Sequence, residues 1–430
     1  MSSTITLLIL LVSFVGFVYC MYKGYNSMLC FFAVSLIWSI CAGKGLKGIL
    51  DVFATGAQSG ATTMLLIIIG SWFGHMMMET GIISGIIKKA VEYSGGKPFV
   101  ICTLMCIITT FIFMTGYGSG VVIAVGVIVL PIMFSLGVPK TIGASAFALS
   151  IGAGLYMNPI MNNISFTPLK GIITDQQKSA YLSFAFIPLL IQLVVTLVVF
   201  IISLRRNANF KRTSAWAADA VADPGHKDAP TISYIIPIVP IVLYMITKID
   251  MVPIYYVTFI VLLILTGNFG KGKKPIAILM KSLKDGVSDV AVLYGFIIGM
   301  QTFITSANAA QNLLGGFFGS ILPSSAFVLI IGLIILAPLA LFRGPLTLYG
   351  AGAAVALAVF SAAVYPPTML LVALVVVSTS FCYSFCPTIG WNAWILNYTQ
   401  VKMSGYLKRC LAQQWPLLAV LLVIVYFIFK

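Results

Sequence analysis

Two glycine-rich polar clusters interrupt long apolar runs, and they hold the residue types that bind small ligands. The first cluster is TGYGSG at 115–120, and the second is RGPLTLYGAG at 343–352. Glycines free the backbone for tight turns and for the close approach of a ligand. Helix N-termini that begin at such turns have exposed N–H groups that favour anions. The clusters supply the substrate candidates Tyr117, Gly118, Ser119, Arg343, Gly344, Thr347 and Tyr349, and the coupling-ion candidate Thr115.

Arg343 is the charge that the sequence places in the middle of an apolar run. A charge at membrane depth is costly and is therefore a functional hypothesis. The planar guanidinium fork matches a carboxylate in two parallel hydrogen bonds. Neither cluster contains an Asp or Glu to neutralise it, which favours an anionic ligand. The alternative is a structural arginine that backbone carbonyls satisfy at a helix end.

Each cluster is followed by an apolar segment that a proline breaks. These breaks are MNPIMNN at 157–163 and CPTIGWN at 386–392. A proline removes one amide and frees a carbonyl one turn back. Freed carbonyls and Asn or Thr oxygens suit a hard cation or a hydroxylated substrate, although a simple kink is the alternative. The substrate candidates here are Asn158, Asn162, Thr388 and Asn392, and the coupling-ion candidates are Ser150, Gly152, Gly154, Ser378 and Ser380.

The choice of coupling ion depends on the titratable groups in the apolar segments. The clusters and breaks contain no carboxylate, and Asp285 and Asp289 are expected near span ends, as is Glu79. His75 is the candidate for a group that titrates within the membrane, although a structural histidine is the alternative. A sodium site needs only oxygens, so the chemistry favours Na⁺ slightly over a proton. No metal site or other cofactor is expected, because the eight cysteines lie in or beside apolar runs without His or carboxylate neighbours.

The composition identifies the element type that must position these residues. Hydrophobic residues make up 60% of the 430 residues and charged residues only 8%, against about 25% charged residues in soluble domains. This excludes a soluble enzyme, a nucleic-acid binder and a disordered scaffold. The net charge of +15 fits basic loops on the cytoplasmic side better than phosphate binding. We expect an all-α polytopic protein of the inner (plasma) membrane, with the lipid bilayer as its surroundings.

The apolar runs define the expected spans. Two runs, 99–138 and 324–365, are about twice the spanning length and turn at the two clusters, so we expect re-entrant hairpins. Two others, 141–165 and 368–397, contain the proline breaks and are expected to be broken helices. The simple spans are 5–22, 27–43, 60–78, 182–204, 231–247, 253–269, 287–304 and 411–429.

The distribution of Lys and Arg sets the expected topology. With ten spans and two hairpins, most basic residues fall in one set of alternate loops, which should be cytoplasmic. Both termini then face outward. The polar stretch 205–230 is expected to be a cytoplasmic linker between the halves.

The two halves, 1–204 and 231–430, match at a shift of about 226 residues in the order of spans, hairpin and break. Because each half has an odd number of spans, five, the second must be inverted relative to the first. Inverted repeats with helix breaks at mid-membrane are typical of secondary transporters. A passive channel needs neither feature. An enzyme is not expected, because no region combines paired carboxylates, a nucleophile with a base, or a metal cluster.

In four motifs the chain resembles the ion transporter superfamily, in particular the gluconate permease branch and the related citrate permeases. The motifs are FIFMTGYGSGVVIAVGVIVLPIM, GASAFALSIGAGLYMNP, FRGPLTLYGAGAAVA and PTIGWNAW. The resemblance implies that each hairpin tip and the facing break form a site, and that a mobile domain moves against a scaffold in a homodimer. The chain departs from that branch at 115–117, where the relatives have an acidic residue, and at 157–159, where they have histidines. The arginine of the second tip is retained, which favours an anionic substrate.

The sequence therefore predicts a secondary active transporter. We expect symport of a small organic carboxylate (gluconate-, citrate- or dicarboxylate-like) with Na⁺ or H⁺, by an elevator-type mechanism. The alternatives are a cation/proton antiporter of the same superfamily, which needs a titrating carboxylate in its core, and a passive channel.

Overall fold

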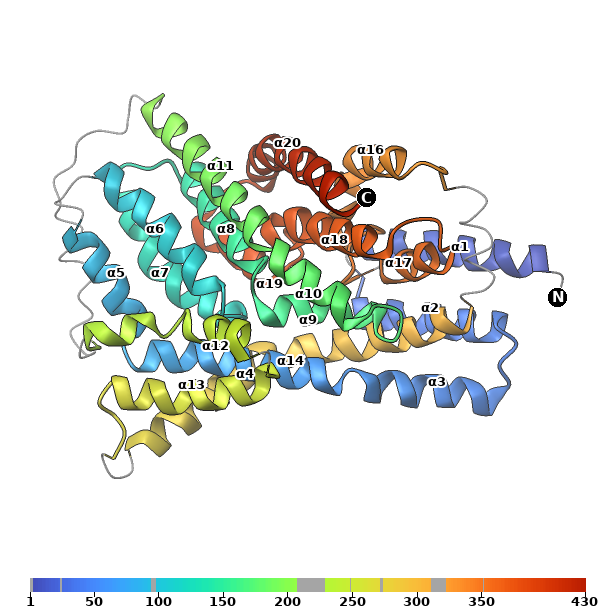
Figure 1. Ribbon diagram of the computed structural model, residues 1–430, viewed down its shortest axis with the longest axis horizontal. Coiled ribbons are helices and arrows are strands. Elements are labelled where there is room, and N and C mark those ends of the chain that lie inside the picture. Colours follow the sequence, from blue (N-terminus) through green and yellow to red (C-terminus); the bar gives the residue numbers. More distant parts are fainter. Residues whose placement is uncertain are drawn as a thin grey trace.

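The computed structural model describes residues 3–23, 25–93, 98–206, 229–247, 249–270, 274–310, 322–350 and 352–430. All the regular elements in these ranges are helical, as the sequence predicts (Figure 1). Most of the expected linker 205–230 lies outside the described residues, so its prediction stays open.

The first half begins with helices that match the expected spans to within a few residues. Its elements are α1 (Ser3–Tyr22), α2 (Ser27–Cys41), α3 (Leu46–Ser59), α4 (Ala61–Glu79), α5 (Ile82–Tyr93), α6 (Pro98–Phe113), α7 (Ser119–Ser135), α8 (Lys140–Leu155), α9 (Pro159–Phe166), the 3-10 turn η1 (Thr167–Leu169), α10 (Asp175–Phe184) and α11 (Phe186–Arg205).

The second half contains one helix of 36 residues together with several short or irregular elements. Its elements are η3 (Thr231–Ile235), α12 (Val239–Thr247), α13 (Met251–Leu265), α14 (Lys274–Ala309), α16 (Ala326–Leu336), η4 (Ala337–Arg343), α17 (Gly352–Ser361), α18 (Pro367–Val377), the π-helix η5 (Ser378–Tyr383), α19 (Gly390–Thr399) and α20 (Met403–Phe429).

Length and composition allow several of these helices to cross a membrane. Four helical stretches among the described residues are long and apolar enough, or up to six if each bent pair is one span. Many large apolar side chains on the described helices are exposed, for example Val194 on α11 at 54% and Phe427 on α20 at 65%. Lipid is the environment that accommodates such a surface. These properties agree with a multi-pass membrane protein.

The breaks occur at the positions that glycine and proline predict. The first cluster joins α6 to α7 across 114–118, and the second joins η4 to α17 across 344–351. In Figure 1, α6 and α7 extend inward from the left end, and α16 and α17 lie towards the right. The chain also bends by 71° between α8 and the α9–η1 segment, where Pro159 begins α9. In the second half, η5 ends near the break that contains Pro387.

Helix α14 joins the two halves, because it packs along α2, α3 and α4 (Figure 1). Close approach depends on glycine: a Cβ at Gly286 would lie 2.8 Å from the backbone nitrogen of Trp72. The indole Nε1 of Trp72 donates to the Leu279 carbonyl and the Ser282 hydroxyl, each at 3.1 Å. Polar and apolar contacts together therefore hold α14 tightly against α4.

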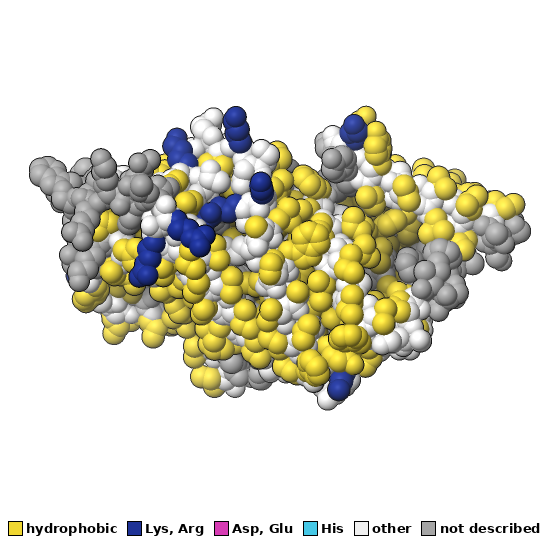
Figure 2. Space-filling model, turned by 90° about the horizontal axis from the view of Figure 1, so that it is seen from above, with side chains coloured by type: hydrophobic (Ala, Val, Ile, Leu, Met, Phe, Trp, Pro, Cys, Tyr) yellow, Lys and Arg dark blue, Asp and Glu magenta, His cyan; other side chains and the backbone are white. Residues whose placement is uncertain are grey.

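The basic residues are unevenly distributed over the surface. Figure 2 shows Lys and Arg side chains gathered mainly over the left half of one face, with apolar side chains over the rest. Exposed basic residues occur where α8 begins, where α11 ends and where α20 begins, namely Lys140, Arg205, Arg206, Lys402 and Lys408. An uneven charge distribution of this kind is what the positive-inside rule requires.

Candidate functional site

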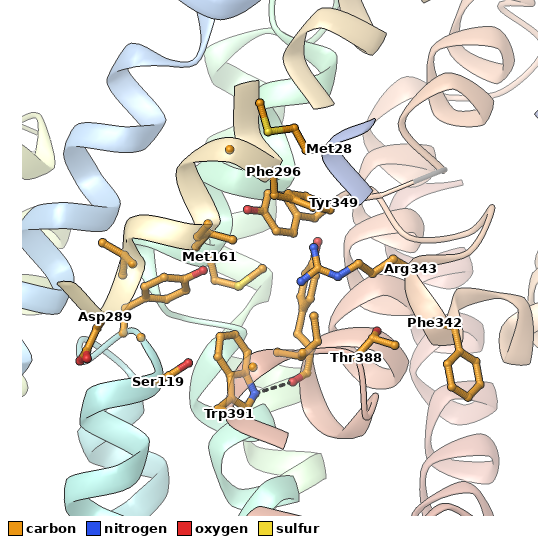
Figure 3. Close-up of a pocket in the computed structure, with 18 of the residues that line it drawn as sticks. Met28, Ser119, Met161, Asp289, Phe296, Phe342, Arg343, Tyr349, Thr388 and Trp391 are labelled. Carbon is orange, nitrogen blue, oxygen red and sulfur yellow. Dashed lines mark hydrogen bonds between the residues drawn. The ribbon is translucent and has the colours of Figure 1, made fainter. Parts of the chain in front are cut away.

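The two hairpin tips and the second helix break meet around one cavity of about 600 Å³ (Figure 3). Pockets of roughly 300–1,000 Å³ hold small molecules. The wall is formed by residues from both halves of the chain, some of which contribute only backbone atoms. It includes Tyr25, Asn26, Met28, Tyr117, Gly118, Ser119, Met161, Asp289, Val290, Leu293, Gly295, Phe296, Phe342, Arg343, Tyr349, Tyr383, Thr388, Ile389, Gly390 and Trp391.

Arg343 provides the cavity with a positive charge that lacks an ionic partner among the described residues. Its guanidinium points into the cavity from one side (Figure 3) and lies over the ring of Phe296, 4.1 Å from the centroid, and near that of Tyr349 at 5.6 Å. Its buried Nη1 has no hydrogen-bond partner in the described part of the chain. Cation–π contacts offset only part of the cost of burying a charge. The site is therefore suited to an anion.

The backbone that carries Arg343 is strained. Phe342 and Arg343 both adopt positive φ values, 55° and 59°, in a region that residues other than glycine seldom occupy. Strain of this kind persists only when the surrounding structure enforces it, and it is concentrated at functional sites. Phe342 points away from the cavity while Arg343 points in (Figure 3). The strained pair therefore directs the guanidinium towards a ligand.

Tyr349 adds a second unsatisfied polar group to the same wall. Its hydroxyl is buried and has no hydrogen-bond partner among the described residues. Leaving a buried hydroxyl without a partner costs about 1–3 kcal/mol. Because the Tyr349 ring lies 5.6 Å from the Arg343 guanidinium, the same wall offers a ligand both a hydroxyl and a guanidinium as hydrogen-bond donors. This arrangement favours a polar, negatively charged ligand over an apolar one.

Two helices begin at the cavity without a side-chain cap. Helix α7 starts at Ser119 after Gly118, whose φ of 100° favours glycine, and α19 starts at Gly390 after Ile389. The two starts are adjacent, because a Cβ at Gly390 would lie 2.9 Å from the Ser119 hydroxyl. Uncapped first-turn N–H groups carry partial positive charge. Together with Arg343 they make the cavity attractive to anions from several directions.

The first tip is fastened to the first break by Asn158. Its amide nitrogen donates to the carbonyls of Phe113 (3.0 Å) and Gly116 (2.9 Å). Its amide oxygen accepts from the backbone nitrogens of Ile160 (3.0 Å) and Met161 (3.1 Å). All the strong hydrogen-bonding positions of this buried side chain are thus occupied within the protein. Asn158 lies behind the cavity wall and positions the tip.

The other end of the tip is held by the second half of the chain. The Thr115 hydroxyl donates to the Pro237 carbonyl, and the Tyr255 hydroxyl donates to the Thr115 carbonyl at 3.1 Å. Thr115 therefore lies against the segment that contains α12 and α13. Its hydroxyl is directed away from the cavity wall.

The second tip is fastened to η5 and the second break. The Ser378 hydroxyl accepts from the Leu348 backbone nitrogen at 3.0 Å, and the Thr347 hydroxyl donates to the Ala340 carbonyl. At the break, Asn392 donates to the Cys386 carbonyl at 3.2 Å. These candidates hold the shape of the site, and Gly344, Asn162, Thr347 and Asn392 are absent from the cavity wall.

The coupling-ion candidates of α8 lie in the packing between helices α6, α8 and η5. The Ser150 hydroxyl donates to the Ala146 carbonyl at 2.8 Å, and the Ser150 carbonyl accepts from Thr110 at 3.0 Å. A Cβ at Gly152 would lie 2.1 Å from the Ser384 hydroxyl, and one at Gly154 would lie 2.5 Å from the Thr110 carbonyl. The Ser380 hydroxyl pairs with the Tyr156 hydroxyl at 2.6 Å. These oxygens contribute to close helix packing.

Asp289 adds a carboxylate to the cavity. It lies in α14 just before the bend of 51° that separates Lys274–Ala291 from Leu293–Ala309, close to the start of the expected span 287–304. Its carboxylate contacts the His75 imidazole, with Nε2 and Oδ2 2.6 Å apart. Asp289 lines the cavity on the side away from Arg343 (Figure 3). The cavity wall therefore holds a carboxylate as well as the guanidinium of Arg343.

Six of the eleven substrate candidates, three from the first tip and three from the second tip and break, share the cavity wall. They are Tyr117, Gly118, Ser119, Arg343, Tyr349 and Thr388. The sequence did not indicate the aromatic wall of Phe296 and Trp391, because α14 carries no local motif. Trp391 could have been proposed as a wall residue from the sequence, because it follows Gly390 directly in the second break.

Comparisons with known proteins agree with a transporter. No family model matches the chain. Over 129 residues, 30% of this chain, it is 24% identical to the Mg²⁺/citrate complex secondary transporter of Bacillus subtilis (strain 168), and the match spans 28% of that transporter's length. The fold is similar to the crystal structure of the YdaH transporter of Alcanivorax borkumensis, with a TM-score of 0.54, 12% identity and coverage of 88% and 89% of the two chains.

These findings define the class of the protein as a polytopic membrane protein with a transporter fold. The resemblance to transporters that the sequence motifs predict is confirmed by the structural similarity over most of the chain and by the short match to a citrate-complex transporter.

Proposed function

We propose that this protein is a secondary active transporter that moves a small organic carboxylate across the membrane with a coupling cation. The observation that carries the proposal is the guanidinium of Arg343, which enters a cavity between two hairpin tips with one nitrogen unpaired among the described residues. The two uncapped helix starts at Ser119 and Gly390 favour the same ligand charge.

The charge balance of the cavity favours a ligand with a single net negative charge. Arg343 is the guanidinium on the wall, and the carboxylate of Asp289 on the same wall is paired with His75. A free polycarboxylate would bring more negative charge than one guanidinium can balance. A monocarboxylate meets the condition, and so does citrate when Mg²⁺ cancels all but one of its charges. The second species is the cargo in the name of the Bacillus subtilis relative.

The proposal is tested by uptake of radiolabelled acids into proteoliposomes. The panel contains citrate with and without Mg²⁺, gluconate, and a dicarboxylate such as succinate, with Na⁺ and pH gradients imposed separately. We expect accumulation of gluconate or of citrate with Mg²⁺, and loss of citrate uptake when a chelator removes the metal. Failure of every acid to accumulate under either gradient would reject the proposal.

A second candidate, a cation/proton antiporter, gains support from Asp289. Such an antiporter needs a titrating carboxylate in its core, and Asp289 supplies one on the cavity wall. It does not explain the unpaired guanidinium, which would repel a cation. The uptake panel separates the two functions, because an antiporter would exchange cations against protons without accumulating any acid.

We propose further that the two halves are inverted repeats that work as an elevator-type transporter in a homodimer. Reciprocal contacts support the repeat: α4 packs on α7 and α13, while its counterpart α14 packs on their counterparts α17 and α2. Gly60 and Gly286 correspond at a shift of 226 residues. A Cβ at Gly60 would contact Ile297, the counterpart of Ser71, and a Cβ at Gly286 would contact Ser71 itself. Such reciprocity is expected of halves related by a pseudo-two-fold axis.

Inverted repeats with outward termini predict the labelling pattern of the C-terminus. With the native thiols removed, a cysteine at Lys430 should react with an impermeant maleimide in intact cells. The reason is that the cytoplasmic face should hold the basic C-terminal end of α11 and the basic N-terminal end of α20, which places the C-terminal end of α20 on the opposite side. A cysteine at Arg206 is the matched control and should react only after lysis. The opposite pattern for the two positions would contradict the proposed orientation.

A further inference from the structure

His75 and Asp289 form an ion pair between two helices of different halves. The imidazole Nε2 lies 2.6 Å from the carboxylate Oδ2, and the side chains are 10% and 25% exposed. His75 belongs to α4 and Asp289 to α14, which pack closely over much of their lengths. Because Asp289 also lines the ligand cavity, the pair connects the α4–α14 interface to the ligand.

Four helices that pack on α4 carry ionisable side chains, namely α3, α5, α13 and α14. Glu79 and Lys281 form their own ion pair at 2.8 Å, and Lys89 pairs with Glu92 at 2.6 Å. The cavity itself adds Arg343 and the phenols of Tyr25, Tyr117, Tyr349 and Tyr383. The remaining groups on these elements are Lys47 and Asp51 of α3, Lys88 and Tyr93 of α5, Tyr255 and Tyr256 of α13, and Lys274, Lys284, Asp285 and Tyr294 of α14.

We propose that the His75–Asp289 pair is the binding site of the coupling proton, an inference that rests on the transport function proposed above. The coupling proton resides on Nε2 of His75, and this N–H donates a hydrogen bond to Oδ2 of the ionised Asp289. Histidine is the side chain whose charge ordinarily changes between about pH 5 and 8. An imidazole paired with a carboxylate of the cavity wall is therefore a suitable side chain for loading and releasing a proton during transport.

The charges explain why the proton and the anion bind together. With the proton bound, the pair is neutral overall, and Arg343 gives the cavity a net positive charge. Without it, the pair carries one negative charge that offsets Arg343. An anion therefore binds better to the protonated form, and by linkage the bound anion strengthens proton binding to the same extent. An inward proton gradient then drives uptake of the acid.

The pair suits a proton better than a sodium ion. Sodium requires several oxygens directed at one point, and the pair offers one carboxylate beside an imidazole. The sequence places the oxygens of a sodium site at the backbone carbonyls of 150–154 and 378–380, with nearby side-chain oxygens. Of these, the Ser150 carbonyl accepts from the Thr110 hydroxyl and the Ser380 hydroxyl pairs with the Tyr156 hydroxyl. The inference therefore departs from the sequence-based preference for sodium.

The first test needs no substrate. The chain has two histidines, His75 and His226, so His226→Gln leaves one imidazole for ¹⁵N-histidine NMR in detergent micelles. We expect the His75 signal to change with pH, and Asp289→Asn to alter that pH response. An imidazole that keeps one protonation state at every pH at which the protein stays folded would overturn the proposal, whatever the protein transports.

The second test counts protons taken up with the anion. Calorimetric titration with Mg²⁺–citrate, and separately with gluconate, in two buffers of different ionisation enthalpy gives the number of protons bound. We expect about one proton per anion at a pH where His75 is unprotonated, with apparent affinity falling up to about tenfold per pH unit above its titration midpoint. His75→Gln and Asp289→Asn should take up none.

The matched control is Glu79→Gln, which removes an ion pair between the same two helices outside the cavity wall. It should keep the wild-type proton count. Anion binding without proton uptake in the wild type, or unchanged uptake in both His75→Gln and Asp289→Asn, would overturn the proton site while leaving carboxylate binding intact. If neither anion binds, the proposed transport function is rejected. The NMR titration needs no substrate, so it still tests the proton site in that case.

Discussion

Replacing Arg343 with alanine is expected to weaken binding of the transported acid by roughly ten- to hundredfold. A hydrogen bond to a charged group contributes about 1.5–3 kcal/mol, which corresponds to that range of affinity. The loss of affinity should be large because the cavity excludes the water that would otherwise solvate the ligand. The substitution also removes the guanidinium beside the Tyr349 ring. Equilibrium binding to purified protein measures the effect separately from transport.

Arg343→Lys distinguishes charge from geometry. Lysine keeps the positive charge but lacks the planar fork, so we expect an affinity between those of the wild type and Arg343→Ala. Arg409 provides the matched control, because it is also a half-buried arginine but donates to Ser145 (3.0 Å) and Ser203 (2.6 Å), away from the cavity. Arg409→Ala should lower stability without a comparable loss of affinity. Wild-type affinity in a folded Arg343→Ala protein would remove Arg343 from the site.

Replacing Asn158 with alanine is expected to be the most destabilising of the substitutions considered. It removes a helix cap, which costs about 1 kcal/mol, and leaves the buried carbonyls of Phe113 and Gly116 without this donor. Each such carbonyl costs about 1–3 kcal/mol. The apparent melting temperature in detergent should fall, and substrate binding should weaken because the first tip is no longer fixed.

Asn158→Asp separates the two roles of the side chain. Aspartate can still cap α9, but it cannot donate to the two carbonyls and adds a repulsive charge beside them. We expect it to be at least as destabilising as alanine. The neighbouring Asn163, which accepts one hydrogen bond from Thr63 at 3.2 Å, is the control, and Asn163→Ala should have a much smaller effect. Equal melting temperatures for the Asn158 and Asn163 alanine variants would contradict this assignment.

The hairpin tips and helix breaks could be predicted from the sequence because glycine and proline act locally. The cluster at 115–120 and the proline at 159 determine their turns whatever packs around them. The role of Asn158 as a helix cap could also have been predicted, because Asn followed by proline is typical of a helix N-cap with proline at the first position. We predicted instead that it binds substrate, because oxygen-rich breaks suit ligands equally well.

The position of Asp289 could not be predicted in the same way. It depends on how α14, which bends by 51° between Lys274–Ala291 and Leu293–Ala309, is placed against the cavity, and no local motif in the sequence determines that placement. The contact with His75 also depends on how two helices from different halves pack. The aromatic wall formed by Phe296 and Trp391 has the same origin, since it exists only when the two halves meet.

The packing of α14 along α2, α3 and α4 has a consequence for how the protein is made. When the ribosome has completed the first half, the faces of α3 and α4 that will receive α14 have no partner. They include Gly56 and Gly60, where α14 approaches closely. At that stage His75 also lacks its partner Asp289, so a polar side chain has no hydrogen-bond partner among its apolar neighbours. Assembly therefore cannot finish in the order of synthesis. The early helices must be kept from other partners in the insertion machinery until roughly the last third of the chain begins to arrive.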